Sequence, residues 1–358
     1  MLSLLLLLTL TLSITTAYPH HHHRSNTNIS NPNTNPTQNT VYWGQSGSRE
    51  KDLSSYCAPS SGIDIIILSF LYQYGNGQRQ PGGTIGEHCK ITAGVAQNCE
   101  SVIAGIESCK VNGVKVILSL GGAEGTYSLS SREEAEAIAQ NLWDSYGNSN
   151  PNPVPNGSWN GDANGNWNGN WNANGNTILR PFGKSFVNGW DFDIESNRGN
   201  EFYPFLIAKL RANFAKDPSN TYIITGAPQC PIPEPNMQGM IAQAQFDYLF
   251  IQFYNNPECS MEKVNFDAWA GNISTGASAN AKLFLGVPAA PLAANGQEDG
   301  ARYFFQPGVL AALVKGFAAR PQFGGVMMWA AGFSDSSASN GCTYAQHAKK
   351  ILRTGGAC

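Results

Sequence analysis

Three carboxylic acids alternate with apolar residues in the segment Gly189-Trp190-Asp191-Phe192-Asp193-Ile194-Glu195. Because side chains alternate between the faces of a strand, Asp191, Asp193 and Glu195 would share one face, about 6.6 Å apart along the strand. Neighbouring carboxylates raise one another's pKa, and burial raises the pKa further. Such a group can hold a proton at neutral pH, which a general acid must do. The segment therefore predicts acid–base chemistry.

The same carboxylates allow two other interpretations. They could form a hydrogen-bonded acidic cluster, or they could bind a cation that prefers oxygen ligands. Outside the tract His20 to His23, which we interpret as part of a solvated tail, the chain has only His88 and His347. That is too few for a three-histidine zinc site, and no nucleophile-elbow motif supports a Ser-His-Asp triad. We expect neither a metal nor a cofactor.

Eight short apolar, β-branched runs along the chain would position these residues. Near-continuous apolar character is typical of strands buried on both faces, and helical patterns such as 131–139, with an acidic first turn, separate several of the runs. Eight strands alternating with helices predict an α/β fold, a single closed (β/α)8 TIM barrel. The runs are 40–43, 63–68, 114–120, 189–195, 222–226, 248–254, 283–287 and 325–329.

One segment, 147–176, interrupts this rhythm before the fourth strand. It is dominated by Asn, Gly and Pro and contains Trp159, Trp167 and Trp171 in quasi-repeats. Such a composition cannot bury a core, so we predict a flexible low-complexity insertion. It lies between a helix and a strand and should emerge on the barrel face opposite the active site. Its Trp rings could still make an accessory contact with a carbohydrate.

The first residues predict secretion. Leu2 to Ile14 form a short apolar run that ends in small residues at Ala17, so we predict a signal peptide over 1–17. Residues 18–38, rich in Asn, Pro, Thr and His, predict a disordered lead-in, which leaves 39–358 for the catalytic domain. Sequons at Asn28, Asn156 and Asn272 are compatible with glycosylation.

Composition narrows the class of partner. The chain has eight cysteines, none in a Cys-x-x-Cys pair, so disulfides in an oxidising compartment are the better interpretation than zinc. The net charge is -3 and only 13% of residues are charged, which gives no reason to expect nucleic acid or an anionic membrane as a partner. A neutral polysaccharide fits better. Nothing indicates an oligomer, so we expect a monomer.

Several motifs together resemble glycoside hydrolase family 18. The segment 188–195 resembles that family's Asp-Gly-x-Asp-x-Asp-x-Glu signature, and Ser119-Leu120-Gly121-Gly122 matches its motif on the third strand. Further motifs resemble the plant and fungal class III, hevamine-like chitinases. These further motifs are 42–45, 227–230, 252–257, 286–291 and 324–329. The resemblance runs from about Asn39 to Trp329, interrupted only by the insertion.

The resemblance implies a mechanism and a set of site residues. Glu195 would protonate the glycosidic oxygen and later activate water, while the substrate's N-acetyl oxygen attacks the anomeric carbon with net retention. Asp193 would orient the acetamide N–H, Asp191 would support Asp193, and Tyr254 would bond the acetamide oxygen. Trp329 would form the floor under the sugar. The implied substrate-binding residues are Trp329, Gln252, Tyr42, Phe70, Gly121 and Gly122.

The resemblance also implies the disulfides Cys57–Cys109, Cys89–Cys99 and Cys230–Cys259, which leaves Cys342 and Cys358 to pair with each other. One departure is Asn188, where the signature has Asp. That position precedes the inward carboxylates, so we expect activity to be kept with a shifted pH dependence.

The function that follows is a secreted endochitinase acting on β-1,4-linked N-acetylglucosamine, with chitin or its oligosaccharides as partner. Three alternatives remain open. They are an enzyme of the same chemistry acting on N-glycan cores or peptidoglycan, a non-catalytic, lectin-like chitin-binding protein, and a metal-dependent hydrolase whose activity a chelator would abolish.

Overall fold

The computed structural model describes residues 37–149, 170–171 and 177–358. The predicted signal peptide and almost all of the predicted lead-in lie outside these ranges, and so do Asn28 and Asn156. Gln38, expected to end the lead-in, is the first residue of strand β1. The described residues belong to one unit that spans Pro36–Cys358.

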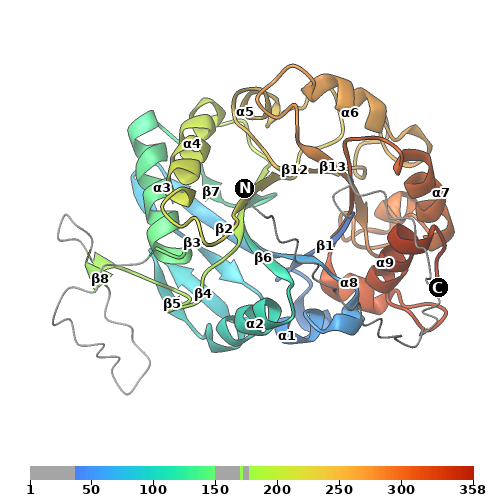
Figure 1. Cartoon of the computed structure of the whole chain (residues 1–358), viewed down its shortest axis with the longest axis horizontal. Helices are drawn as coiled ribbons and strands as arrows, with labels where there is room; N and C mark the ends of the chain where they lie inside the picture. The colour runs from blue at the N-terminus through green and yellow to red at the C-terminus, as the bar shows by residue number, and fades with distance from the viewer. Residues whose placement is uncertain (1–36, 150–169, 172–176) are drawn as a thin grey trace, which may run out of the picture. The chain divides into compact units, whose positions relative to one another are not determined.

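Eight parallel strands form a closed barrel (Figure 1). β1 pairs with β2 on one side and with β14 on the other, which closes the ring. The eight-stranded α/β barrel expected from the apolar runs is confirmed. The barrel strands are β1 (Gln38–Trp43), β2 (Ile65–Gly75), β6 (Lys115–Gly122), β10 (Gly189–Ile194), β11 (Ile223–Gly226), β12 (Tyr248–Gln252), β13 (Lys282–Pro288) and β14 (Phe323–Trp329).

Helices surround the barrel and follow its strands in the chain (Figure 1). The predicted acidic helix is α3, whose N-cap Ser131 accepts a hydrogen bond from the Glu134 N–H. The α-helices are α1 (Leu53–Tyr56), α2 (Glu100–Val111), α3 (Arg132–Tyr146), α4 (Tyr203–Phe214), α5 (Gln238–Gln243), α6 (Phe266–Ile273), α7 (Pro307–Phe317), α8 (Ala331–Ser336) and α9 (Tyr344–Thr354). The 3-10 helices are η1 (Gly47–Arg49), η2 (Pro59–Ser61), η3 (Asn200–Phe202), η4 (Met261–Lys263) and η5 (Glu298–Tyr303).

Strand alternation divides the core into two layers. Ile66 and Leu68 of β2 join the large cluster between barrel and helices, whereas Ile65 and Ile67 join a separate cluster inside the barrel. The same alternation holds in β10, where Trp190 stacks on Phe214 of α4 at 5.5 Å between ring centroids. Even positions of β10 therefore face the helices, which leaves its odd positions for the interior.

β2 continues beyond the barrel into an antiparallel extension that the apolar runs did not predict. Its strands are β3 (Gln78–Ile85), β4 (Cys89–Thr92) and β5 (Val95–Gln97), and β7 (Thr126–Tyr127) pairs with β2 beside them. β4 and β5 alternate exposed residues with less exposed ones, so they lack the continuous apolar run by which the barrel strands were found.

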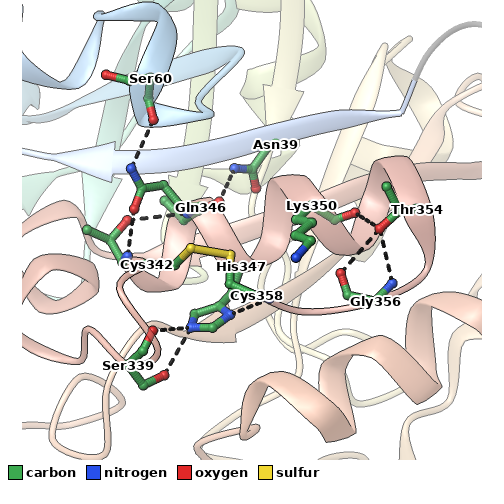
Figure 2. The surroundings of a disulfide bond; sticks show 12 residues. Asn39, Ser60, Ser339, Cys342, Gln346, His347, Lys350, Thr354, Gly356 and Cys358 are labelled. Carbon is green, nitrogen blue, oxygen red and sulfur yellow. Dashed lines mark hydrogen bonds between the residues drawn. A yellow bond between two sulfur atoms is a disulfide. The ribbon is translucent and has the colours of Figure 1, made fainter.

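Four disulfides join Cys57 to Cys109, Cys89 to Cys99, Cys230 to Cys259 and Cys342 to Cys358. These are the expected pairs. Figure 2 shows the last of them, with the buried His347 ring beside it. Nε2 of His347 lies 2.9 Å from Oγ of Ser339, and its Nδ1 accepts the Cys358 N–H at 3.1 Å.

Most of the predicted insertion, with Trp159 and Trp167, lies outside the described residues. Within it, β8 (Asn170–Trp171) pairs antiparallel with β9 (Thr177–Ile178). The segments on the two sides of the insertion meet at Arg180. The Arg180 guanidinium donates to the carbonyls of Asp144 at 2.6 Å and Gly147 at 3.0 Å. These ends lie near the start of β10, because the Tyr146 carbonyl accepts the Val187 N–H. Where the insertion itself emerges stays a prediction.

Among the described residues, no helix is long and apolar enough to span a membrane.

Candidate active site

A cleft of about 840 Å³ opens at the carboxyl ends of the barrel strands. Its walls include the ends of β6, β10, β12 and β14 together with the extension of β2. Seven of the residues singled out from the sequence line it, namely Phe70, Gly122, Asp193, Glu195, Gln252, Tyr254 and Trp329. Residues far apart in the chain are therefore gathered around one hollow.

Asp191 lies deepest of the three carboxylates and is fully buried. Three hydroxyl groups donate to it, from Tyr42 at 2.7 Å, Ser119 at 2.6 Å and Thr225 at 2.6 Å. Burial raises the pKa of Asp191, although these hydrogen bonds act in the opposite direction. The three donors come from β1, β6 and β11, so Asp191 ties β10 to strands on different sides of the barrel.

Asp193 lies two residues after Asp191 on the same face of β10 and is 5% exposed. Its Oδ1 accepts a hydrogen bond from Nε2 of Gln252 at 3.0 Å. Burial raises the pKa of Asp193 well above its ordinary value, and the charges of Glu195 and Asp191 raise it further. A carboxyl group in this position can hold a proton between its two acidic neighbours.

Glu195 follows the last residue of β10 and is partly exposed to the cleft. Its backbone N–H donates to Oη of Tyr127 at 3.0 Å, and that hydroxyl donates to the Gly122 carbonyl at 2.8 Å. Burial raises the pKa of Glu195, a side-chain hydrogen bond from Gln229 lowers it, and the charge of Glu234 raises it. The net direction is upward, which favours the protonated form that a general acid needs.

Tyr254 lies at the end of β12 and lines the cleft with only 6% of its surface exposed. Burial raises its pKa well above the ordinary value, and the charges of Asp193 and Glu195 add to that rise. The phenol therefore stays protonated at neutral pH, so it can donate a hydrogen bond to a group in the cleft.

Trp329 forms an aromatic wall with Phe70 and Tyr42. Its ring stacks on Phe70 at 5.9 Å and meets Tyr42 edge-on at 5.5 Å between centroids. Trp329 and Phe70 both face the cleft. An apolar surface beside buried carboxylates suits a sugar ring, because one face of the ring presents C–H groups while its edge presents hydroxyls.

The residues expected to contact substrate divide into two groups. Phe70, Gly122, Gln252 and Trp329 line the cleft, whereas Tyr42 and Gly121 do not. Tyr42 instead donates its hydroxyl to Asp191. Gly121 has φ +107°, and a Cβ there would meet the Asp193 carbonyl oxygen at 2.1 Å, so this glycine permits close packing of β6 against β10.

Sequence reasoning missed several polar residues that serve the three carboxylates. Ser119 and Thr225 bond Asp191, the hydroxyl of Tyr127 accepts the Glu195 N–H, and Gln229 lowers the pKa of Glu195. Strand parity could have found Ser119, because it lies two residues before Gly121 and pairs in register with Asp191. Tyr127 and Gln229 lie beyond the ends of the barrel strands β6 and β11, where the alternation of side chains along those strands gives no guidance.

Within the described ranges, no group of three or more His, Cys, Asp or Glu side chains is arranged to hold a metal ion. Each of the three carboxyl groups instead has polar partners of its own, which come from elements other than β10. The arrangement suits proton transfer between carboxyl groups and a molecule in the cleft.

Comparison with known proteins gives a consistent result. The model of the family "Glycosyl hydrolases family 18" matches residues 38–315. Endochitinase 2 of Metarhizium robertsii is 51% identical over 336 residues, which cover 90% of this chain and 74% of that relative.

Two solved structures have the same barrel. A chitinase from Ipomoea carnea is 30% identical with a TM-score of 0.67, over 88% of this chain and 98% of the other. A xylanase and alpha-amylase inhibitor protein from Scadoxus multiflorus is 28% identical with a TM-score of 0.64, over 89% of this chain and 98% of the other. Chains similar to this one therefore include an enzyme and an inhibitor.

Proposed function

The chain belongs to glycosyl hydrolases family 18, and from that premise we propose that it is a secreted endochitinase in which Glu195 is the general acid and base. The substrate is a polymer of β-1,4-linked N-acetylglucosamine. Similarity to named endochitinases over most of the chain supports this substrate.

The observation that carries the proposal is the graded exposure of the three carboxylates. Asp191 is fully buried, Asp193 lines the cleft with 5% of its surface exposed, and Glu195 is the most exposed of the three. Glu195 is therefore the carboxyl group best exposed to reach a glycosidic oxygen. Burial raises its pKa, which favours the protonated form that a general acid needs.

The buried position of Asp193 favours a nucleophile that belongs to the substrate. In retaining enzymes with two catalytic carboxylates, the second one attacks the anomeric carbon. Asp193 is held by Gln252 and its raised pKa disfavours the anion, so it suits a hydrogen bond to the acetamide N–H better than attack. The acetamide oxygen then forms the new bond to the anomeric carbon as the glycosidic bond breaks.

In the remaining steps Glu195 gives up its proton and then regains one. Glu195 gives its proton to the leaving oxygen, and its carboxylate then takes a proton from the water that opens the cyclic intermediate. The configuration at the anomeric carbon is retained because two displacements occur. The hydroxyl of Tyr254, which faces the cleft as an undissociated phenol, stabilises the acetamide oxygen.

Product release from N-acetylglucosamine oligomers, with the first anomer observed by NMR, tests the proposal. We expect the wild type to release the β-anomer and Glu195→Gln to lose activity by a factor of roughly 10³ or more. The Gln variant keeps the size of the side chain, so binding of oligomers should persist. An initial α-anomer, or full activity of the variant, would overturn the mechanism.

A second candidate is a non-catalytic binding protein, because a chain of 28% identity is named as an inhibitor protein. The two functions predict different results from the same samples. A binding protein retains oligomers and insoluble chitin without releasing product at any pH. Asp191, Asp193, Glu195 and Tyr254 are all present with raised pKa values, which favours the enzyme.

Secretion is part of the proposal. The apolar run that ends near Ala17 is typical of a signal peptide. Four disulfides support an oxidising destination, because such bonds are rare in reducing compartments.

A further inference from the structure

The strand pairing that holds β10 in the barrel ends just before Glu195. On one side, the pairing of β10 with β6 reaches as far as Ile194, which lies opposite Gly122. On the other side, the pairing of β10 with β11 ends at Phe192. The residue that carries the reactive carboxyl group therefore lies one position beyond the barrel ladder, and its backbone needs a different support.

The side-chain hydroxyl of Tyr127 provides that support. Its oxygen accepts the Glu195 N–H at 3.0 Å and donates to the Gly122 carbonyl at 2.8 Å. Gly122 is the last residue of β6 and the last that pairs with β10. The hydroxyl therefore bridges the two strands directly after their ladder ends. A phenol can do this because one oxygen both accepts and donates a hydrogen bond.

The backbone of Tyr127 is held by a third strand. Tyr127 belongs to β7, which pairs with β2 so that Tyr127 lies opposite Tyr74. The loop that leads from Gly122 to Tyr127 approaches β2 closely at Gly125. This glycine has φ +147°, and a Cβ there would meet the Tyr72 carbonyl oxygen at 2.6 Å. The loop thus returns the hydroxyl of Tyr127 to the end of β6.

The ring of Tyr127 is fixed by a row of buried aromatic side chains. It stacks on Tyr74 at 5.6 Å between centroids, and the hydroxyls of Tyr74 and Tyr203 lie 2.8 Å apart. Tyr203 begins α4 and meets Phe192 of β10 edge-on at 5.9 Å. Tyr127 is buried, and burial raises its pKa to about 12. The hydroxyl therefore keeps its proton, and with it both hydrogen bonds, at acidic and neutral pH.

We propose that Tyr127 is a positioning residue for the reaction, whose hydroxyl fixes the backbone of Glu195 against the end of β6 and so holds the acid at the cleft. The inference rests on the proposed function of Glu195. The restrained N–H and the Cα–Cβ bond belong to the same residue, so a fixed N–H limits the direction of the side chain. Tyr127 is not among the residues that line the cleft, so it acts through Glu195.

The test is Tyr127→Phe, which removes the hydroxyl and keeps the ring in its stack. The Glu195 N–H and the Gly122 carbonyl then lose the partner that they share. We expect kcat on N-acetylglucosamine oligomers to fall roughly 10- to 100-fold, because a small displacement of a reacting group has an effect of this size. KM should change much less, because the residues that line the cleft are all retained.

Tyr344→Phe is the matched control. The hydroxyl of Tyr344 is also buried and also donates to a backbone carbonyl, that of Phe305 at 2.6 Å, but Tyr344 begins α9 and does not line the cleft. Both variants should unfold at lower urea than the wild type, whereas only Tyr127→Phe should lose kcat. An unchanged kcat in Tyr127→Phe, or an equal loss in both variants, would overturn the proposal.

Hydrogen exchange separates this proposal from the proposed function. The amide of Glu195 is followed by NMR in protein labelled with ¹⁵N-glutamate, and its resonance is assigned from its loss in Glu195→Gln. We expect this amide to exchange roughly 10-fold faster or more in Tyr127→Phe, because its acceptor is gone, and at the wild-type rate in Tyr344→Phe. Equal rates in wild type and Tyr127→Phe would refute the positioning. An inactive wild type would refute the enzyme, and the exchange rates would still decide whether Tyr127 holds Glu195.

Discussion

At the scale of single residues, each carboxylate has its own environment although all three come from one strand. Asp191 accepts hydroxyl donors from three other strands, Asp193 accepts an amide, and Glu195 faces the cleft. Burial is the main cause of the raised pKa in all three. Neighbours then determine how the proton is shared, because like charges at short range cannot all ionise.

The pH dependence of the reaction follows from these shifts. Glu195 must be protonated to act, and its pKa is raised above the ordinary value of about 4.3. Activity should therefore persist above that pH and fall as pH rises through the raised pKa. Glu234→Gln removes a negative charge that raises this pKa, so the alkaline limb should move to lower pH.

The measurement is kcat/KM against pH for the wild type and Glu234→Gln. Glu100→Gln is the control, because Glu100 is an exposed residue in the first turn of α2. A limb that moves upward in Glu234→Gln, or moves equally in both variants, would contradict the electrostatic explanation.

At the scale of elements, one side chain joins the two described segments that flank the insertion. The guanidinium of Arg180 donates to four carbonyls, those of Asp144 at 2.6 Å, Gly147 at 3.0 Å, Gly183 at 2.7 Å and Ser185 at 3.3 Å. Its Nη1 also donates to Oγ of Ser149 at 2.9 Å. Arg180 thus joins the end of α3 to the segment that leads into β10.

Arg180→Met should therefore destabilise the fold by about 3 kcal/mol, because several carbonyls lose a charged donor at a half-buried site. Urea unfolding, followed by tryptophan fluorescence, measures the change. Arg79→Met on β3 is the control, since Arg79 is exposed, and its midpoint should stay near that of the wild type. Equal midpoints for the two variants would mean that Arg180 does not support the junction.

At the scale of the whole molecule, the barrel closes where the beginning of the described chain meets its end. β1 pairs with β14, and α9 packs against β1 through the Asn39 amide, which donates to the Ala345 carbonyl at 2.9 Å. Lys349 of α9 also pairs with Asp64 just before β2, at 2.7 Å between Nζ and Oδ2. The Cys342–Cys358 disulfide ties the residues after α9 back to the loop before it (Figure 2).

Removal of the Cys342–Cys358 disulfide should cost stability and spare catalysis. Its sequence separation of 16 residues corresponds to about 3 kcal/mol of loop entropy. The Cys342→Ser/Cys358→Ser variant should unfold at lower urea with unchanged kcat/KM. Cys230→Ser/Cys259→Ser, with a separation of 29, should lose about 4 kcal/mol and activity as well, because that bond ties the segment after β11 to the loop that follows Tyr254 at the cleft. Equal activity of the two variants would contradict this distinction.

Some of this protein could be predicted from its sequence because the physical cause is local. The inward face of Asp191, Asp193 and Glu195 follows from the two-residue repeat of a strand, and the eight apolar runs follow from burial on both faces. The barrel was therefore predictable, and so was the group of acids. The antiparallel extension of β2 was not, because β4 and β5 alternate exposed residues instead of forming an apolar run.

Only the tertiary structure determines which side chain forms a hydrogen bond with which carboxylate. The hydroxyl of Tyr42 reaches Asp191 across 149 residues of sequence, and Gln252 reaches Asp193 across 59. Tyr42 was expected to bind substrate, but the closed barrel turns its hydroxyl to Asp191. Gln229 lies beside Gln252 through a parallel bridge and accepts a hydrogen bond from the Asn256 amide. Contacts of this kind depend on the distance between strand ends after closure, and no local pattern of residues contains that distance.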